Sequence, residues 1–266
     1  MSATTASPAN DVMRHIEAGV ATITLNRPDK LNAMNGAMVR ALSDSLDAAE
    51  AGGARALLVR GEGRAFCSGR DLAEADPLHE DGEAILRDLF NPLMARISDL
   101  AVPTIAAVHG ACLGTGLGLA LACDIVYAAD DARIGSPFAR IGSVLDSGAH
   151  AAFVSRVGPH RALELVYTGR LLSGREAADW GLVNRSVAGA DLIRRTREMA
   201  RTIAAGPTMA FLESKRIVRS IQDGSPSLAD LLAAEAAAQG RASRTHDYQE
   251  GIAAFQEKRR PTFTGR

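Results

Sequence analysis

Two glycine-rich segments could form a site for a negatively charged oxygen. They are GRAFCSGRDL (63–72) and HGACLGTGLGLA (109–120), and each follows a predicted strand and leads into a predicted helix. The first N–H groups of a helix have no partner within it, so such turns offer free backbone donors. Two turns that meet at one oxygen would form an oxyanion hole, which stabilises negative charge as it develops.

The glycines of the second segment also allow other interpretations. Gly114, Gly116 and Gly118 could simply permit close packing of the helix. A dinucleotide-binding fingerprint is excluded by spacing, because G-x-G-x-x-G from Gly114 needs a glycine where Leu119 stands. The sequence also lacks the phosphate-binding motif G-K-[ST]. The packing role and the oxyanion hole both remain open.

Asp146 is the only carboxylate in RIGSVLDSG (140–148), a stretch of apolar and small residues. If Val144, Leu145 and Phe138 surround it, its pKa should be raised, as suits a general base that gives and takes a proton. The alternative is that Asp146 is the N-cap of the next helix. A cap near the helix dipole would have a lowered pKa instead. Both roles could coexist at a helix start.

Three other polar residues compete for roles near these segments. His150 follows Asp146 by one helical turn and could bond to it, although a polar helix position explains it equally well. His109 ends a predicted buried strand, which indicates a structural histidine. Asp71 is predicted to cap a helix after the first glycine turn.

The cysteines indicate neither a metal site nor a redox motif. Cys67, Cys112 and Cys123 form no C-x-x-C pair and no cluster with metal-ligand spacing. We expect Cys112 and Cys123 to be small core residues. No apolar signal segment precedes them, so we expect a reducing, cytoplasmic location.

The elements that would position these residues alternate between strands and helices. Strands are predicted over 19–26, 55–63, 103–110, 124–129 and 182–187. Helices are predicted over 36–53, 116–124, 148–158, 159–169, 173–181, 207–224, 227–240 and 245–260, the last with Thr245 as its N-cap. We therefore expect a disordered segment 1–11, an α/β core over 12–190 and a helical arm over 191–266.

The composition fits a globular protein. Of the 266 residues, 47% are apolar and 23% charged, and the formal net charge is −1. Such a charge gives no long-range attraction to nucleic acid or to an anionic membrane. The longest apolar run, 101–129, is interrupted by proline, glycines and Asp124, which indicates buried strands and a helix. We expect neither a nucleic-acid nor a membrane partner.

Several motifs together resemble the enoyl-CoA hydratase/isomerase family, the crotonase superfamily. They are LNRPDKLNAMN (25–35), GRAFCSGRDL, GLALACDIVYAADDARIGSPFARIG, ELVYTGRLLSGREAADWGLVNRSV and EGIAAFQEKRRPTF (250–263), and the resemblance runs from about residue 13 to 263. It implies an α/β spiral of β-β-α turns with a helical C-terminal arm that forms homotrimers, often paired into hexamers. It also implies an acyl-CoA thioester substrate, so coenzyme A belongs to the substrate and no separate cofactor or metal is expected.

The resemblance assigns positions to the parts of such a ligand. The thioester oxygen would be held by the backbone N–H groups of Cys67 and Thr115, where Thr115 departs from the family's usual glycine. The thiol of Cys67 is expected to be incidental. Further residues correspond to coenzyme A contacts: Arg27 and Lys30 near the phosphates, the Ala65 backbone at the adenine, and Phe255 and Lys258 of the last helix at a neighbouring subunit's coenzyme A. Surface charge is the alternative role for Arg27 and Lys258.

The hydratases of this family use two glutamates, and both are missing here. Their positions fall on Gly118 and Phe138, neither of which transfers a proton, so efficient hydration is not expected. Gly118, Phe138 and Leu145 are instead predicted to shape the acyl pocket. The aryl-CoA dehalogenases carry a tryptophan at the position of Phe138, which argues against that activity.

Asp146 matches the single catalytic aspartate of the Δ3,Δ2-enoyl-CoA isomerases and ring 1,2-epoxyphenylacetyl-CoA isomerases. The resemblance therefore favours isomerisation through an enolate. A hydratase or thioester hydrolase of the same family and an acyl-CoA-binding protein without activity are the alternatives.

Overall fold

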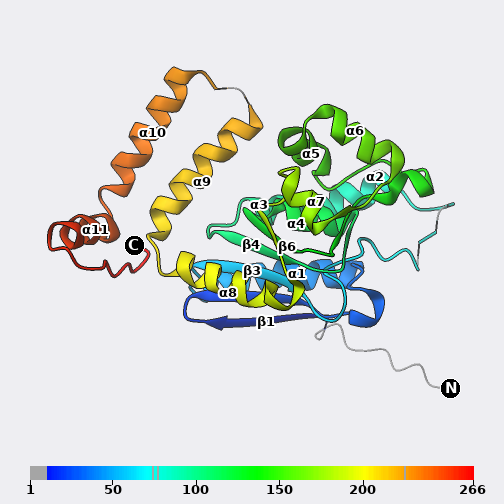
Figure 1. Cartoon of the computed structure of the whole chain (residues 1–266), viewed down its shortest axis with the longest axis horizontal. Helices are drawn as coiled ribbons and strands as arrows, with labels where there is room; N and C mark the ends of the chain where they lie inside the picture. The colour runs from blue at the N-terminus through cyan, green and yellow to red at the C-terminus, as the bar shows by residue number, and fades with distance from the viewer. Residues whose placement is uncertain (1–10, 74, 77, 225) are drawn as a thin grey trace.

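The main sheet has six strands. They are β1 (Val12–Glu17), β2 (Val20–Leu25), β3 (Ala56–Gly61), β4 (Thr104–Val108), β6 (Ile125–Ala129) and β9 (Arg185–Val187), in the order β1-β2-β3-β4-β6-β9. β1 is antiparallel to β2, and the other pairs are parallel. This computed structural model, shown in Figure 1, describes residues 11–73, 75–76, 78–224 and 226–266.

A second sheet of three strands begins directly after β4 of the main sheet. It contains β5 (Ala111–Leu113), β7 (Arg133–Gly135) and β8 (Leu172–Ser173), with β5 parallel to β7 and β7 antiparallel to β8. Only His109 and Gly110 separate β4 from β5. A Cβ atom at Gly110 would lie 1.9 Å from the carbonyl oxygen of Arg64, so the sharp passage between the sheets requires glycine.

Helices surround the two sheets. They are α1 (Gly36–Ala51), α2 (Gly82–Ile85), the π-helix η3 (Leu86–Phe90), α3 (Asn91–Ser98), α4 (Thr115–Ala122), α5 (Ala149–Val157), α6 (Pro159–Thr168), α7 (Gly174–Asp179), α8 (Gly189–Ala204), α9 (Thr208–Asp223), α10 (Leu228–Ala242) and α11 (His246–Gln256). Two short 3-10 helices are η2 (Pro28–Lys30) and η4 (Pro137–Ile141). No helix within the described parts of the chain is long and apolar enough to cross a membrane.

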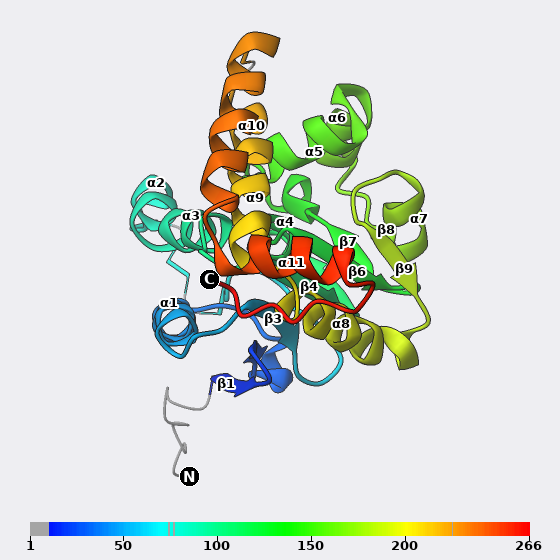
Figure 2. The same ribbon diagram turned by 90° about the vertical axis from the view of Figure 1, so that its left-hand side faces the viewer.

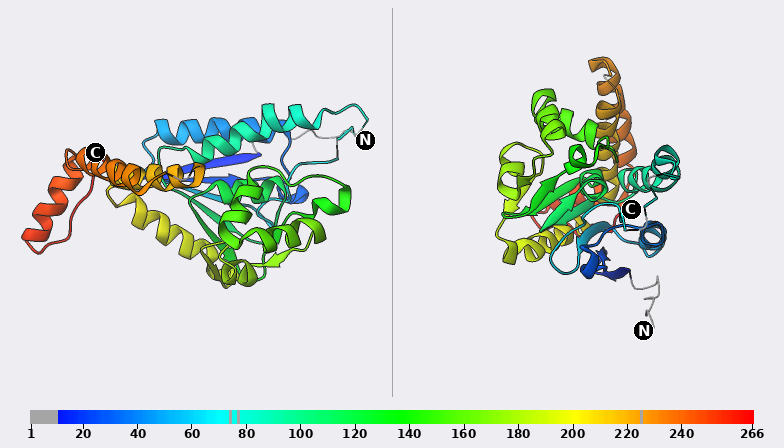
Figure 3. Two further views of the ribbon diagram at one scale, coloured as in Figure 1. Left: turned by 90° about the horizontal axis from the view of Figure 1, so that it is seen from above. Right: turned by 90° about the vertical axis from the view of Figure 1, so that its right-hand side faces the viewer.

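The last helices divide into one that belongs to the core and three that project. α8, although inside the predicted arm 191–266, packs on β3, β4 and β6. Only α9, α10 and α11 extend away from the sheets (Figures 1 and 3). α9 and α10 lie side by side, as Figure 2 shows.

The predicted strands and helices are all present, most of them within two or three residues of the expected ends. Thr245 is the N-cap of α11, because its side chain accepts a hydrogen bond from Tyr248 N. The prediction for Asp71 is wrong, because the described residues between Asp71 and α2 form no helix, and the Asp71 carboxylate accepts from Ala73 N. The predicted disordered segment 1–11 lies outside the described residues apart from Asp11, whose carbonyl oxygen accepts from Asn26 N.

Several elements were not predicted. β1 exposes most of its residues, and β5, β7 and β8 are only two or three residues long, so neither periodicity nor length identified them. The helical segment α2–η3–α3 was also missed. This last omission matters most, because the segment forms one wall of the site described below.

Candidate functional site

A cavity of about 600 Å³ lies where four segments meet. These are the first glycine turn, the start of α4, the α2–η3 segment and the turn between η4 and α5. Asp146 is the only acidic side chain among the described residues that line it. Apolar side chains from η3 and η4, including Phe90 and Phe138, form much of the remaining wall.

Cys67 does not supply a free donor, which corrects the sequence prediction. Its N–H donates to the carbonyl oxygen of Ala111 over 3.0 Å, and Leu113 N donates to the Cys67 carbonyl over 2.9 Å. Cys67 therefore joins the glycine turn to β5. Burial raises the pKa of its thiol to about 12, so the thiol stays protonated at neutral pH.

Arg70 provides the N–H group that Cys67 does not. Gly69 and Asp71 pair with Met34 on one side of the turn, through Met34 N to Gly69 O at 2.8 Å and Asp71 N to Met34 O at 2.9 Å. The N–H of Arg70, which lies between them, has no partner among the described residues and belongs to the wall of the cavity.

Thr115 supplies a second free donor. It is the first residue of α4, so its N–H has no partner within the helix. The two turns are adjacent, because a Cβ atom at Gly69 would lie 3.5 Å from Thr115 N and 2.9 Å from Leu113 O. With a φ of +99°, Gly69 allows this close approach. The Arg70 and Thr115 N–H groups therefore open into one cavity.

Asp146 is not the cap of α5. The N-cap is Gly148, and α5 has no side-chain capping bond. Asp146 Oδ1 instead accepts a hydrogen bond from Ser147 Oγ over 2.8 Å. Burial raises the pKa of the Asp146 carboxyl, and the Ser147 hydroxyl, His150 and Arg70 oppose this rise. The direction of the net shift agrees with the general-base interpretation of Asp146 and not with the helix-cap interpretation.

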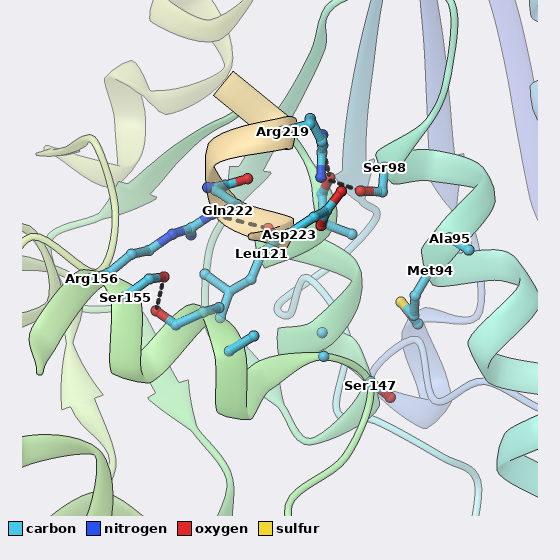
Figure 4. A pocket seen from close by; sticks show the side chains of 15 residues that line it. Met94, Ala95, Ser98, Leu121, Ser147, Ser155, Arg156, Arg219, Gln222 and Asp223 are labelled. Atoms are coloured by element: carbon cyan, nitrogen blue, oxygen red, sulfur yellow. Dashed lines mark hydrogen bonds between the residues drawn. The ribbon is translucent and has the colours of Figure 1, made fainter. Parts of the chain in front are cut away.

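Two predicted pocket residues do not line this cavity. Leu145 is 5% exposed and packs in the hydrophobic core. Gly118 lines a second cavity of about 310 Å³ between α3, α4, α5 and α9 (Figure 4). Phe138 does line the first cavity, with its ring against the Gly114 backbone, where a Cβ atom would lie 2.9 Å away.

Gly118 has a packing role that the sequence left open. A Cβ atom there would lie 2.3 Å from Ser147 Cβ and 2.7 Å from the Ser147 carbonyl oxygen. The space that a larger side chain would need is therefore filled by the residue next to Asp146. The resemblance placed a hydratase glutamate at this position, and a glutamate would not fit here unless that turn moved.

The guanidinium of Arg27 contacts two carboxylates and a backbone carbonyl oxygen. Its guanidinium lies 3.0 Å from an Asp71 carboxylate oxygen and 3.6 Å from that of Asp11, and it donates to Ala33 O over 2.5 Å. Arg27 therefore connects the segments that contain Asp11, Ala33 and Asp71 around η2. These contacts involve Nε and Nη1, and the predicted phosphate contact of Arg27 stays a prediction.

Lys30 and Ala65 remain compatible with their predicted contacts. Lys30 is exposed at the end of η2, and its carbonyl oxygen accepts from Ser68 Oγ over 3.4 Å, which places it next to the cavity wall. Ala65 is buried, and its carbonyl oxygen already accepts from Asn32 Nδ2 over 2.7 Å. One lone pair of that oxygen remains for a second donor.

Phe255 and Lys258 lie far from this cavity within one chain. Phe255 is in α11, at the end of the molecule opposite α2 (Figures 1 and 3). Lys258 lies in the turn after α11, with a φ of +55°, and not in the helix as predicted. Neither can contribute to the cavity of its own chain in this arrangement.

The histidines and cysteines do not form a second site. His109 Nε2 bonds to the Gly63 carbonyl over 2.9 Å, whereas Nδ1 is buried without a partner in the described structure. His150 is exposed and influences Asp146 through its charge. Within the described ranges, no group of three or more His, Cys, Asp or Glu side chains is placed to hold a metal ion.

Sequence reasoning missed several residues of the cavity. Arg140 was not among the predicted pocket residues, but it lines the cavity. Ile85, Leu86 and Phe90 come from the unpredicted α2–η3 segment. A π-helical turn is uncommon and often marks a functional site, yet it has no pattern that a sequence alone displays.

Comparison with known proteins gives consistent matches over nearly the whole chain. Residues 15–266 match the family model described as enoyl-CoA hydratase/isomerase. The chain is 39% identical over 251 residues to the probable enoyl-CoA hydratase of Rhodobacter capsulatus, covering 94% of this chain and 96% of that protein. It is 36% identical over 261 residues to the 1,2-epoxyphenylacetyl-CoA isomerase of Escherichia coli K12, covering 96% and 98%.

Solved structures match over the same span. A crystal structure of enoyl-CoA hydratase from Mycobacterium smegmatis superposes with a TM-score of 0.87 at 32% identity, covering 95% of this chain and 98% of that one. The enoyl-CoA hydratase structure from Bacillus anthracis gives a TM-score of 0.88 at 31% identity, covering 96% and 100%.

Proposed function

Because the chain belongs to the enoyl-CoA hydratase/isomerase family, we propose that it isomerises acyl-CoA thioesters with a single carboxylate, Asp146. The predicted family and the predicted α/β crotonase fold are both confirmed. The observation that carries the proposal is that Asp146 is the only acid lining the cavity among the described residues, beside the free N–H groups of Arg70 and Thr115.

In the proposed reaction Asp146 removes a proton from the α-carbon of a β,γ-unsaturated acyl-CoA. The electron pair moves onto the thioester oxygen, and the Arg70 and Thr115 N–H groups hold the resulting enolate. Asp146 then returns the proton to the γ-carbon while the double bond moves to the α,β position. Substrate and product contain the same atoms, so no water is consumed.

Hydration would need more proton-transferring groups than line the cavity. One group must activate water and another must deliver a proton, which in this family is the work of two carboxylates. The corresponding positions hold Gly118, packed against Ser147, and Phe138. Asp146 alone suits a proton transfer in which one group acts first as base and then as acid.

The remaining contacts of the substrate belong to the same proposal. Lys30 would bind the coenzyme A phosphates, and the Ala65 carbonyl would accept from the adenine amino group. Phe255 and Lys258 would act on a neighbouring subunit, because they lie far from the cavity of their own chain. The proposed assembly is therefore a homotrimer, alone or paired into a hexamer.

The test is product analysis with trans-3-hexenoyl-CoA and trans-2-hexenoyl-CoA. We expect the purified protein to convert the first into the second, and Asp146→Asn to lower kcat by about 10²–10⁴-fold. The related hydratase names make water addition the competing outcome. Rapid formation of 3-hydroxyhexanoyl-CoA by both the wild type and the variant would refute a reaction built on Asp146.

A further inference from the structure

The hydroxyl group of Ser147 has no part in the proposed reaction, yet it contacts the proposed base. Its Oγ donates a hydrogen bond to Asp146 Oδ1 over 2.8 Å. We infer that Ser147 is a positioning residue, whose hydroxyl holds the Asp146 carboxylate so that Oδ2 is the atom that takes and returns the proton. The inference rests on the proposed function, since it applies to the reaction only if Asp146 is the base.

The backbone at Ser147 has a conformation that serine rarely adopts. Its φ is +56°, in the left-handed region, and that of the next residue, Gly148, is +77°. Left-handed residues other than glycine persist only where surrounding contacts hold them, and they are common at active sites. Ser147 donates its hydrogen bond to Asp146 from within this turn.

Contact with α4 holds Ser147 in this place. Its side chain is 7% exposed, and its Cβ and carbonyl oxygen pack directly on Gly118. Figure 4 shows Ser147 at the start of α5, at the edge of the second cavity. Ser147 thus separates the two cavities: Asp146 lines one, and Ser147 lines the other. The missing side chain at Gly118 is what allows this contact.

The same hydrogen bond affects the charge of Asp146. A donor to the carboxylate favours ionisation, so Ser147 lowers the pKa of Asp146 while burial raises it. Arg70, which is also paired with Glu80 at 2.6 Å, and His150 on α5 are the charged groups acting on Asp146, and both lower its pKa as well. Removing the hydroxyl should therefore shift the titration of Asp146 to higher pH.

The test compares Ser147→Ala with the wild type and with Ser155→Ala. Ser147→Ala removes Oγ but keeps the Cβ that packs on Gly118. Ser155 is the matched control, because its Oγ bonds only to the Ala152 carbonyl within α5. If Ser147→Ala does not fold, Ser147→Gly replaces it, since glycine suits a φ of +56°.

Two readouts separate this inference from the proposed function. The first is the pKa of Asp146 itself, measured by NMR titration of protein labelled with ¹³C in the aspartate carboxyl groups, with Asp146→Asn identifying the signal. It requires no activity. The second is the pH dependence of kcat and KM for isomerisation of trans-3-hexenoyl-CoA.

We expect Ser147→Ala to raise the pKa of Asp146, to shift the acid limb of kcat to higher pH and to lower kcat about tenfold or more, with KM little changed. Ser155→Ala should match the wild type in both readouts. An unchanged Asp146 titration in folded Ser147→Ala would overturn the inference. A raised pKa without isomerisation by the wild type would overturn the proposed function, while the effect of Ser147 on Asp146 would stand.

Discussion

Asp146 combines two properties that a single proton-transfer group needs. Burial makes its ionised form less favourable, which raises its pKa toward the range where it can both take and give a proton. The Ser147 hydroxyl, Arg70 and His150 keep that rise limited. A carboxylate protonated at neutral pH could not act as a base, so the opposing contacts matter as much as burial.

Replacing Asp146 with Asn should raise the melting temperature at neutral pH. A carboxyl with a raised pKa stabilises the fold fully below its unfolded pKa and loses that contribution as the pH rises through the folded pKa. At neutral pH the buried carboxylate is therefore costly, and Asn avoids this cost. We expect an increase of about 1–3 °C that shrinks toward acid pH, measured by calorimetry across a pH series.

The matched control is Asp230→Asn. The Asp230 carboxylate accepts hydrogen bonds from Ser227, the N-cap of α10, and these bonds lower the pKa of Asp230. This variant should lower the melting temperature at neutral pH. A fall in the melting temperature of Asp146→Asn at neutral pH would contradict the claim that burial dominates at Asp146.

The sequence was enough to single out Asp146 but not its environment. One carboxylate among apolar residues is visible in the printed sequence, but the direction of its pKa shift stayed open between a buried base and a helix cap. The contact between Ser147 and Gly118 is different, because it joins a residue of the turn before α5 to a residue of α4, and no periodic pattern brings these together. The sequence therefore left the role of Gly118 undecided between packing and pocket.

At the scale of elements, the site depends on two turns that the sheets bring together. Cys67 pairs with β5, and Gly69 and Asp71 pair with Met34, whereas the Arg70 N–H has no partner among the described residues. α4 begins at the neighbouring turn and leaves the Thr115 N–H free. Gly69 lies against the second turn, next to Leu113 and Thr115.

Gly69→Ala should therefore remove activity. A new Cβ would lie 2.9 Å from Leu113 O and 3.5 Å from Thr115 N, at a φ of +99° that alanine tolerates poorly. Moving the two donors apart should lower kcat by about 10²–10³-fold, the usual cost of losing an oxyanion-hole donor. Steady-state kinetics with trans-3-hexenoyl-CoA would measure it.

The control for backbone strain is Gly53→Ala. Gly53 has a φ of +71°, but no atom lies within 4 Å of its Cβ position. This variant should lose some stability and keep its kcat. Equal losses of kcat in both variants would mean that the approach of the two turns is not required.

The error at Cys67 shows why such donors are hard to assign from sequence. Cys67 and Arg70 lie in the same glycine turn, and the sequence does not show which of their N–H groups forms a hydrogen bond within the sheets. Cys67 pairs with β5, an element too short to predict, so the wrong donor was chosen. The α2–η3 wall of the cavity was missed for the same reason, because its helices are short and irregular.

At the scale of the whole molecule, the projecting helices are fixed to the core at their base. Arg55, next to β3, donates to the carbonyl oxygens of Gly206 and Phe263. Asp247, which is 2% exposed, accepts from Thr264 N over 2.6 Å and from Gly265 N over 2.7 Å. These hydrogen bonds hold the start of α9 to the core and the C-terminal residues to the core and to α11.

These helices expose apolar side chains that a neighbouring subunit would cover. The residues are Val218, Ile221, Leu228, Leu232, Ile252 and Phe255. A mass of three or six chains of 27.9 kDa is expected by light scattering after size exclusion. Leu232→Asp should dissociate the assembly and raise KM, because Phe255 and Lys258 would no longer reach the neighbour's substrate.

The control is Leu163→Asp on α6, a leucine of similar exposure outside the projecting helices. It should leave the mass unchanged. A wild-type monomer with full activity would contradict the proposed assembly.

The most direct test of the central claim is proton exchange at the α-carbon of the thioester. Wild-type protein and Asp146→Asn would each be incubated with trans-3-hexenoyl-CoA in D₂O, and deuterium would be followed by NMR and mass spectrometry. The account predicts deuterium at the α- and γ-carbons with the wild type and a loss of at least about 10²-fold with the variant. Equal exchange by both proteins would contradict the claim that Asp146 is the base.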